Sequence, residues 1–395
     1  MTGTFVYDPA QPDFQERAYE IYRMLRDELP VYHSEQAGFW ALSRFDDVRA
    51  AAADPQTFSS EGTDTSQGLL PMIQALDPPR HDVLRQLVSK AFTPRRVSDL
   101  EPGIRRIARE LIDGFAGDGE VDLLGRFARH LPSLVFGELL GVPHDRREKF
   151  LVWTQALVEA KPGTGSAESQ RHPAIKIYQE FTKLLAERRE RHGDDLMSAL
   201  LDAEIDGRRL SEEELLGFCF VLIVAGNDTT TNLIANGAVL LADHPDQRKL
   251  LVQSPEDIPN AIEEMLRYES PVQALPRIAR RRVDLHAATI PKGALVRLVW
   301  GSANRDEREF EEPDRFDVTR AIPRHLAFGQ GVHFCLGANL ARLEARVAFE
   351  ELLARIPEYQ LRERPGWLTS IWARAHPAVP VSLRRVVSSR QLASG

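Results

Sequence analysis

The sequence contains only two cysteines among 395 residues, Cys219 and Cys335, and they lie far apart in different local contexts. Two distant cysteines cannot form a disulfide framework, so a disulfide-rich secreted scaffold is excluded and a reducing compartment is expected. The first residues contain neither a basic region nor an apolar stretch of the kind that directs secretion or anchors a chain in a membrane. The sequence therefore predicts a cytoplasmic protein without membrane association.

The chain also lacks a Gly/Ser/Pro-rich linker, a long block of like charges and a repeat of fixed period. We therefore expect one domain spanning residues 1–395, with a polar tail from about residue 387 that is frayed. The formal net charge of −8 disfavours nonspecific binding to nucleic acid, and no nucleic-acid-binding motif is present. A hydrophobic content of 43% is sufficient for one large core.

Helical periodicity dominates the pattern of apolar residues, for example at Ile104, Ile107 and Leu111. Strand-like patterns are short and occur near residues 38–43 and 295–299. The expected fold class is therefore mainly α with small β-sheets, an α+β arrangement. The segment 162–166, PGTGS, interrupts two helical stretches and predicts a mobile loop.

Cys335 lies in a loop rich in glycine, FGQGVHFCLG, which runs from Phe328 to Gly337. Gly329 and Gly331 permit positive φ and allow the backbone to approach a flat ligand closely. Beyond the cysteine, apolar residues recur at helical spacing at Leu336, Leu340, Leu343 and Val347. The sulfur should therefore lie near a helix N-terminus, where the dipole and free amides favour a thiolate that can bind a metal. The alternative is a buried structural cysteine beside glycines, which is our interpretation of Cys219 among its apolar neighbours.

A long central helix is predicted between a capping box at residues 211–214, SEEE, and the sequence DHP at 243–245. Six polar residues, 227–232, follow its apolar first half. Such a polar run is costly in a buried helix unless the side chains are satisfied or functional. Thr229 can donate a hydrogen bond back to the carbonyl of Ala225, and Gly226 leaves space for a flat ligand. Solvent exposure of these polar residues is the alternative.

The cysteine loop resembles, position by position, the haem-binding signature of the cytochrome P-450 family of haem-thiolate monooxygenases. The AGNDT sequence from Ala225 to Thr229 matches the Ala-Gly-x-acid-Thr pattern of the same family. The resemblance implies a soluble bacterial-type member with the triangular fold of the family. It also implies haem b, iron protoporphyrin IX, bound between the long central helix and the cysteine-loop helix, with Cys335 as its axial ligand. On this resemblance Asp228 and Thr229 are the catalytic acid–alcohol pair that relays protons to dioxygen.

The resemblance also assigns residues around the cofactor. The expected haem contacts are Ala225, Gly226, Phe328, Gly329, His333 and Gly337, and the expected partners of the haem carboxylates are His81, Arg85, Arg277 and His333. His81 and Arg85 are four residues apart and so share a helix face. Glu264, Arg267 and Arg315 are expected to form a buried charge network that supports the cysteine loop. Each of these residues taken alone could equally be an ordinary surface or structural side chain.

The expected function is a monooxygenase that hydroxylates or epoxidises a small apolar molecule, with a role in secondary metabolism. No flavin or iron–sulfur motif is present, so electrons should come from separate proteins. The expected partners are a ferredoxin and a ferredoxin reductase, or equivalent electron donors, and we expect the protein to be a monomer. Arginines could dock an acidic ferredoxin, although a solvated helix face is the alternative; they are Arg95, Arg96, Arg105, Arg106, Arg109, Arg342 and Arg346.

The substrate pocket is expected at residues 61–76 and 153–172 and at a few further positions, which are also what a core would look like. The individual candidates are Leu76, Leu222, Ala225, Val272, Leu275, Ile371 and Trp372. Two other functions remain open: a peroxygenase driven by hydrogen peroxide, and a noncatalytic haem-based binding or sensor protein. The acid–alcohol pair argues against the former, and the lack of a visible signalling domain argues against the latter.

Overall fold

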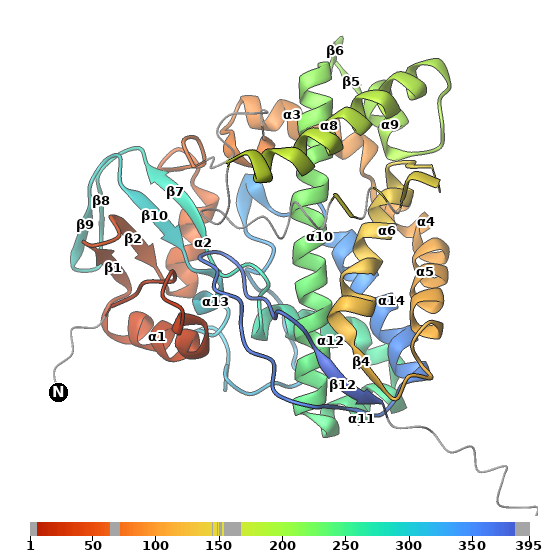
Figure 1. Ribbon diagram of the computed structural model, residues 1–395. Coiled ribbons are helices and arrows are strands. Elements are labelled where there is room, and N and C mark those ends of the chain that lie inside the picture. Colours follow the sequence, from red (N-terminus) through yellow and green to blue (C-terminus); the bar gives the residue numbers. More distant parts are fainter. Residues whose placement is uncertain are drawn as a thin grey trace, which may run out of the picture.

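The computed structural model describes residues 6–63, 72–143, 145–147, 149, 152–153 and 167–383. Helices make up the larger part of the molecule, and the largest sheet lies to one side of them together with α1 and α2 (Figure 1). The prediction of a mainly α protein with small sheets is confirmed. The expected loop at 162–166, the tail from 387, and most of the expected pocket segments 61–76 and 153–172 lie outside the described residues.

The helices are α1 (Phe14–Glu28), α2 (Phe45–Ala53), α3 (Arg80–Ala91), α4 (Pro94–Asp99), α5 (Glu101–Asp113), α6 (His130–Leu139), α8 (Ala167–Glu190), α9 (Leu196–Asp202), α10 (Glu212–Asp243), α11 (Pro245–Gln253), α12 (Ile258–Tyr268), α13 (Trp300–Ala303) and α14 (Ala338–Arg355). Short helical turns are η1 (Ile73–Ala75), η2 (Leu124–Ala128), η3 (Pro255–Asp257) and η4 (Gly331–His333). The strands are β1 (Val31–Ser34), β2 (Phe39–Leu42), β3 (Phe58–Ser59), β4 (Glu120–Asp122), β5 (Glu204–Ile205), β6 (Arg208–Arg209), β7 (Leu275–Ala279), β8 (Val283–Leu285), β9 (Ala288–Ile290), β10 (Leu295–Leu298), β11 (Tyr359–Leu361) and β12 (Pro380–Leu383).

The largest sheet joins two distant parts of the chain, in the strand order β1-β2-β10-β7-β3. The pair β2 and β10 is parallel, with Phe39 opposite Leu295 and Leu42 opposite Leu298. The other pairs in this sheet are antiparallel. The two strand-like stretches found in the sequence are therefore neighbours, and the sheet places β7 beside β3.

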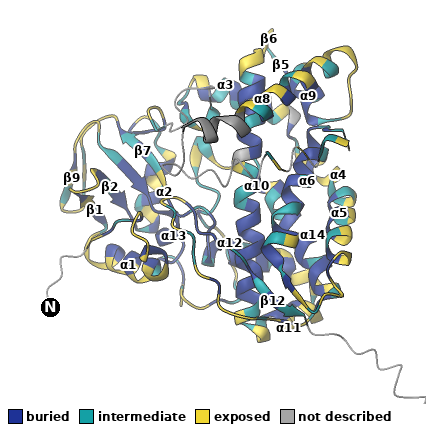
Figure 2. Ribbon diagram, viewed as in Figure 1, coloured by how far each residue is buried: buried dark blue, intermediate teal, exposed yellow. Residues whose placement is uncertain are grey.

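Helix α10 is the central element of the helical part. The predicted capping box is confirmed, because Ser211 Oγ accepts from the Glu214 amide while the Glu214 carboxylate accepts from the Ser211 amide. The helix contacts α6, α12 and α14, and most of its length is buried (Figure 2). By length and composition alone α10 could cross a membrane, but 71% of its apolar window is buried inside the protein. This burial, and the polar run in its middle, are those of a core helix.

The described core confirms the interpretation of Cys219, which is fully buried among the apolar residues of the helical part. Cys335 is the other free cysteine, and it is exposed. The two cysteines thus occupy opposite environments. Only Cys335 is accessible to a ligand.

Candidate active site

The cysteine loop adopts the backbone that its glycines predicted. Gly329 and Gly331 both have φ of +73°, a region that side chains other than glycine rarely adopt. A Cβ atom on Gly331 would lie 2.8 Å from the carbonyl oxygen of Ala52, so this glycine also lets the loop pack against the end of α2. The amide of Cys335 donates to the carbonyl of Phe328 at 2.9 Å, which closes the loop.

The electrostatics of Cys335 differ from the expectation. Although Cys335 is exposed, the protein atoms around its sulfur desolvate the thiol and raise its pKa, while the Gly337 amide and the charges of Arg85 and Arg342 act in the opposite direction. The amide is present as predicted, immediately before α14, but it does not outweigh desolvation. Because metal binding displaces the thiol proton, the thiolate would form on ligation rather than exist beforehand.

Four predicted partners of the haem carboxylates gather beside the loop. The imidazole rings of His81 and His333 lie 4.4 Å apart between centroids, and His333 Nε2 lies 3.0 Å from Ser60 Oγ. Arg85 donates to the carbonyl of Phe334 at 2.6 Å, so His81 and Arg85 do face the loop together from α3. Burial, aided by the neighbouring charges of Arg277 and His81, lowers the pKa of His333 to about 3.

Arg277 shows that this cluster is electrostatically incomplete. Its side chain in β7 is buried, and its hydrogen bond is to the carbonyl of the adjacent Pro276, at 2.7 Å. Burial lowers the pKa of Arg277 to about 10, and the carboxylate of Asp77 only partly opposes this shift. Among the described residues, no carboxylate lies within ion-pair distance of Arg277 or Arg85. A buried cation of this kind requires an anion, and the two carboxylates of haem fit that need.

This site provides one protein ligand for a metal, the thiol of Cys335, and not a cluster of ligands. Within the parts of the chain that the structure describes, no group of three or more His, Cys, Asp or Glu side chains could hold a metal ion. An iron atom bound by Cys335 would therefore need most of its ligands from a porphyrin. The glycine loop, the accessible sulfur and the incomplete cationic cluster together fit haem.

The polar stretch of α10 is only partly as predicted. Ala225 is exposed in the middle of this buried helix, which is consistent with a helix face that opens onto a ligand space. Thr229 Oγ1 donates to the Ala225 carbonyl at 2.8 Å, as expected. Burial raises the pKa of Asp228 to about 6, although Arg129 and the Asn232 amide lower it. Asn227 accepts a hydrogen bond from Ser133 at 2.8 Å and thereby fixes α10 to α6.

Gly226 has a packing role that the sequence did not indicate. A Cβ atom on Gly226 would lie 2.2 Å from Cζ of Phe136, in α6. The missing side chain therefore makes room for a buried aromatic ring of the neighbouring helix, and the close approach of a flat ligand at Gly226 stays a prediction. Helix packing, which a single sequence does not reveal, determines this glycine.

The charge network contains a different third arginine from the predicted one. Glu264 and Arg267 are fully buried and form a bidentate pair, with N–O distances of 2.7 and 2.8 Å. Arg315, however, is exposed and pairs with Glu312 at 3.1 Å and Asp317 at 3.5 Å. Arg320 reaches Glu264 instead, at 3.3 Å. The chain turns between residues 315 and 320 in such a way that the later arginine points inward, and spacing alone did not indicate this.

The network does reach the cysteine loop. Arg267 donates to the carbonyl of Asn304 at 3.1 Å, and the Asn304 side chain accepts from the Leu326 amide at 2.7 Å. Leu326 is two residues before Phe328, the first residue of the loop. The buried charges thus hold the entry to the loop through one asparagine.

The expected pocket residues fall into two groups. Leu76 and Leu222 are buried in the core, whereas Leu275, Ile371 and Trp372 are exposed by 38%, 50% and 39%. Val272 is bridged to Ala373, and the Gln273 amide donates to the Trp372 carbonyl at 2.7 Å. The exposed residues therefore lie on adjoining segments at the surface, while Leu76 and Leu222 are part of the core.

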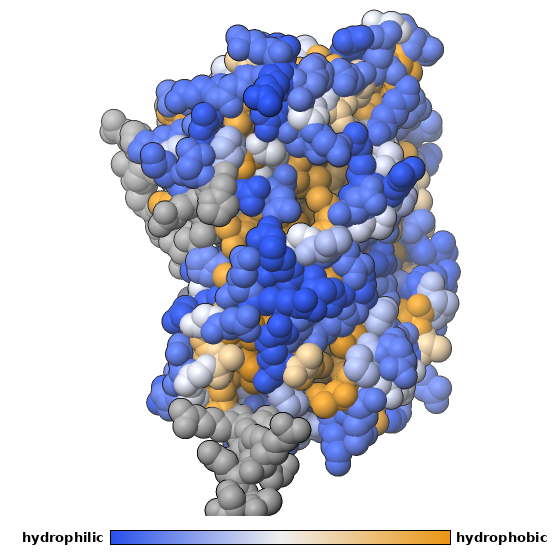
Figure 3. All heavy atoms as spheres, turned by 90° about the vertical axis from the view of Figure 1, so that its right-hand side faces the viewer, coloured by the Kyte–Doolittle hydropathy of each residue, from blue (hydrophilic) through white to orange (hydrophobic). Residues whose placement is uncertain are grey.

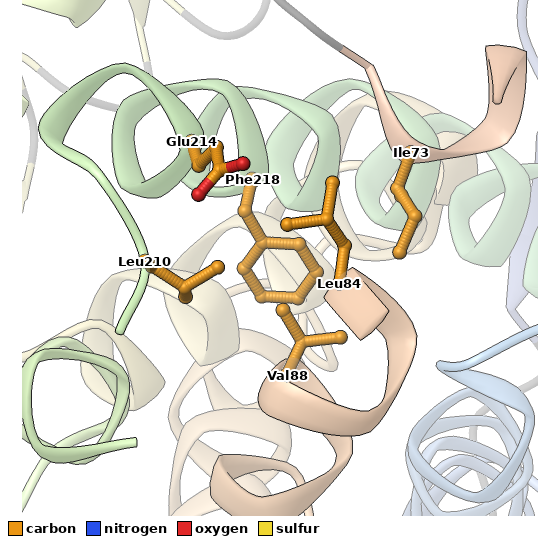
Figure 4. Close-up of a pocket in the computed structure, with 6 residues that line it drawn as sticks. All are labelled: Ile73, Leu84, Val88, Leu210, Glu214 and Phe218. Carbon is orange, nitrogen blue, oxygen red and sulfur yellow. The ribbon is translucent and has the colours of Figure 1, made fainter. Parts of the chain in front are cut away.

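A small cavity lies elsewhere, between the N-terminal half of α10 and α3 (Figure 4). Its volume is about 10 Å³, which is room for one water molecule. Its lining is mostly apolar: Ile73, Leu84, Val88, Leu210, Glu214 and Phe218. Leu84 and Val88 follow His81 and Arg85 by three residues each, so all four lie on one broad face of α3. With room for no more than one water molecule, this cavity is a packing defect.

Most of the arginines considered for docking are already paired with carboxylates. Arg105 and Arg109 contact Glu351, and Arg346 contacts Glu101 and Glu350, so α5 and α14 share one ionic network. Arg106 pairs with Glu138 and Arg342 with Glu263. The face that carries α5 is largely hydrophilic (Figure 3). Only Arg95 and Arg96, in α4, have no carboxylate partner within the described ranges.

One buried group was not anticipated. Glu344 in α14 is fully buried, and neither carboxylate oxygen has a hydrogen-bond partner among the described residues. Burial raises the pKa of Glu344 well above its ordinary value. Nothing in the sequence indicated this burial, because a glutamate on a charged helix is usually exposed.

Comparisons with known proteins agree with this site. The family model described as Cytochrome P450 matches residues 164–253 and 258–357. Cytochrome P450 monooxygenase PikC of Streptomyces venezuelae is 41% identical over 394 residues, which cover 94% of this chain and 92% of that protein. Vitamin D(3) 25-hydroxylase of Pseudonocardia autotrophica is 41% identical over 372 residues, which cover 91% of each.

Among solved structures, the Bacillus subtilis bacillaene polyketide synthase cytochrome P450 PksS has a TM-score of 0.91 at 34% identity, covering 96% of this chain and 100% of that one. The fold and the site define a haem-thiolate enzyme. The chain belongs to the cytochrome P450 family and is a haem-thiolate monooxygenase, with cysteine thiolate ligation of the haem.

Proposed function

We propose that this enzyme uses dioxygen and electrons from separate proteins to hydroxylate or epoxidise an apolar small molecule of secondary metabolism. The observation that supports this most directly is the acid–alcohol pair Asp228–Thr229, which follows the exposed Ala225 on the helix that packs against α14. A peroxide-driven enzyme or a haem-based sensor would not need such a pair. We further propose that the chain is one domain, monomeric and cytoplasmic.

The cofactor in this proposal is haem b, which supplies the redox chemistry of dioxygen activation when bound. Cys335 would bind its iron. Arg277 and Arg85, with His81 and His333 beside them, would bind its carboxylates and thereby fill the charge deficit of that cluster. Phe328, Gly329 and Gly337 would shape the surface on the cysteine side.

Asp228 is proposed to supply protons. A carboxyl whose pKa is about 6 can both hold and release a proton near neutral pH, which is the property of a useful general acid. Thr229 would direct that proton, because its hydroxyl is oriented by its hydrogen bond to Ala225 and lies next to the exposed face of the helix. An ordered water would complete the transfer.

The substrate is proposed to be apolar, because Leu275, Ile371 and Trp372 present exposed hydrophobic surface on adjoining segments. The names of two relatives, a vitamin D(3) hydroxylase and a polyketide synthase P450, are consistent with a largely apolar substrate. Ile371 and Trp372 are held by their backbone, since Arg297 donates to the Ile371 carbonyl and Gln273 to the Trp372 carbonyl. Their side chains are therefore presented by a fixed segment.

Electrons are proposed to come from a ferredoxin and its reductase. With the arginines of α5 and α14 neutralised, Arg95 and Arg96 are the members of the basic set whose charge is available to an acidic partner. Charge reversal at both positions should slow reduction by ferredoxin and weaken its dependence on salt. Arg17→Glu, on the exposed side of α1, is the control, since α1 and α4 lie on opposite sides of the molecule (Figure 1). An unchanged rate in the double variant would exclude this docking site.

The test of the reaction is Thr229→Ala. We expect this variant to divert electrons from product to hydrogen peroxide, whereas Thr229→Ser, which keeps the hydroxyl, should retain coupling. Peroxide yield per electron consumed is the measurement. Full coupling in Thr229→Ala would reject the proton relay, and a red-shifted carbonyl band that survives Cys335→Ser would reject the thiolate assignment.

A further inference from the structure

Two adjacent glutamates of α12 bind different arginines. Glu264 belongs to the buried pair with Arg267 described above. Both oxygens of Glu263 instead accept from Arg342 of α14, at 2.7 and 2.8 Å. The same carboxylate lies 2.9 Å from Nε2 of His325. Glu263 thus joins α12 and α14 to the chain just before the loop.

His325 is fixed in one protonation pattern by its neighbours. The Ala327 amide donates to His325 Nδ1 at 3.1 Å, so Nδ1 has no proton and Nε2 donates to Glu263. The side chain is almost fully buried. The Leu326 amide is bonded to Asn304. Hydrogen bonds therefore hold three successive residues, His325 through its side chain and Leu326 and Ala327 through their backbone amides. Phe328, which follows, accepts the amide hydrogen of Cys335.

Arg342 also contacts the loop through Phe328. Its guanidinium carbon lies 4.5 Å from the centre of the Phe328 ring. The centres of the His325 and Phe328 rings lie 5.8 Å apart. The charge of Arg342 acts on the Cys335 sulfur as well, in the direction that favours a thiolate. Its bidentate partner Glu263 partly cancels that charge. Arg342 therefore both packs against Phe328 and places a positive charge near Cys335, and Glu263 offsets part of that charge.

We propose that Glu263 is a positioning residue that holds Arg342 against Phe328 and balances its charge, and that this balance sets the reduction potential of the haem bound by Cys335. The inference rests on the proposed assignment of Cys335 as the iron ligand. Reduction adds one electron to the site, so a positive charge nearby favours the reduced state and a negative charge opposes it. The two members of the pair must then act in opposite directions.

The experiment compares the haem-loaded Glu263→Gln and Arg342→Gln variants by spectroelectrochemical titration. Glu263→Gln leaves Arg342 unbalanced and should raise the potential, whereas Arg342→Gln leaves Glu263 unbalanced and should lower it. Arg342→Lys keeps the charge and should stay close to the wild type. Damage to the loop alone would move both Gln variants in the same direction, so a shared direction, or no shift in either, would overturn the proposal.

Glu350→Gln is the matched control. Glu350 also bridges arginines at α14, Arg346 and Arg105, and its side chain is 21% exposed against 25% for Glu263. It lies eight residues beyond Arg342, about 12 Å further along the helix. The same change of charge there should therefore shift the potential much less, and an equal shift would overturn the proposal.

The carbonyl spectrum separates failure of this inference from failure of the site. If the reduced wild type with carbon monoxide lacks the red-shifted band of a thiolate ligand, the assignment of Cys335 falls, and this inference falls with it. If the band is present and the two Gln variants do not diverge, only the role of Glu263 is rejected. Should Glu263→Gln yield no haem-loaded protein, Arg342→Gln against Arg342→Lys still decides: the proposal requires a lowered potential in the former alone.

Discussion

Two groups of arginines lie near the cysteine loop, and they differ in what balances their charge. Among the described residues, Arg277 and Arg85 have backbone carbonyls and no carboxylate as hydrogen-bond partners, and burial lowers the pKa of both. In the network between α5 and α14, carboxylates surround the guanidinium groups, and the pKa of Arg105 is raised. The first group is stable only with a further anion, while the second is complete in the protein alone.

The carboxyl groups repeat this contrast. Burial outweighs the charge of Arg129 and raises the pKa of Asp228 to about 6, whereas burial of Glu351 is outweighed by hydrogen bonds from Arg109, Arg105 and Arg355, which hold its pKa at about 2. Unbalanced buried charge therefore marks the functional side of the molecule, and balanced charge marks the supporting side. The following changes should separate the two.

Asp228→Asn should give the largest change, and a pH-dependent one. The folded pKa of about 6 lies above the unfolded value of 3.8, so the stability that depends on this carboxyl is fully present below pH 3.8 and is lost as pH rises through 6. The variant lacks this loss, and its advantage should grow between about pH 4 and 6 to about 3 kcal/mol and then stay constant. Urea denaturation of both proteins across this range is the measurement, and a difference that does not change with pH would contradict the assigned pKa.

Arg277→Gln should weaken haem retention. Loss of one charged hydrogen bond to a haem carboxylate corresponds to about 2 kcal/mol, or roughly thirtyfold faster transfer of haem to an acceptor apoprotein. Without haem the variant should be no less stable than the wild type, because a buried unpaired charge is removed. A large loss of stability in the haem-free variant would show that Arg277 is structural instead.

Glu351→Gln should behave in the opposite way. Three arginines lose a shared partner, yet all are partly exposed, so we expect a loss of about 1 kcal/mol in the free energy of unfolding. Haem transfer should be unchanged. High salt should reduce the difference between wild type and variant, and faster haem loss in this variant would erase the distinction between the two groups.

Arg315→Ala should have the smallest effect, within about 0.5 kcal/mol, because its pairs with Glu312 and Asp317 are exposed. Arg320→Ala is the matched comparison. It leaves the buried Glu264 short of a partner and should cost more than Arg315→Ala in thermal or urea unfolding. Equal effects would contradict the assignment of Arg320, in place of Arg315, as the third member of the buried network.

The sequence predicted well what local patterns determine. The capping box of α10, the bond from Thr229 to Ala225 and the positive φ of Gly329 and Gly331 all depend on residues close in the chain. The resemblance to a family added His81, Arg85, Arg277 and His333, which the fold does bring to one place. Their spacing, from residue 81 to 333, contains no local signal of that proximity.

What the sequence missed depends on which way a side chain points after packing. Gly226 is required by Phe136 of another helix, and Arg320 replaces Arg315 because of a turn of the chain. The arginines of α5 looked like a docking surface because their carboxylate partners in α14 lie more than 240 residues away. Such pairings are set by tertiary contacts, which one sequence cannot show.

The parallel pairing of β2 with β10 has a consequence for synthesis of the chain. Residues 39–42 can pair early with β1, but they find their partners in β10 only after residues 295–298 have left the ribosome, so this edge of β2 must wait for most of translation. Ser60, which contacts His333, waits even longer. The haem-binding side is thus assembled from the two ends of the chain, and we expect the enzyme to acquire its cofactor only after translation is nearly complete.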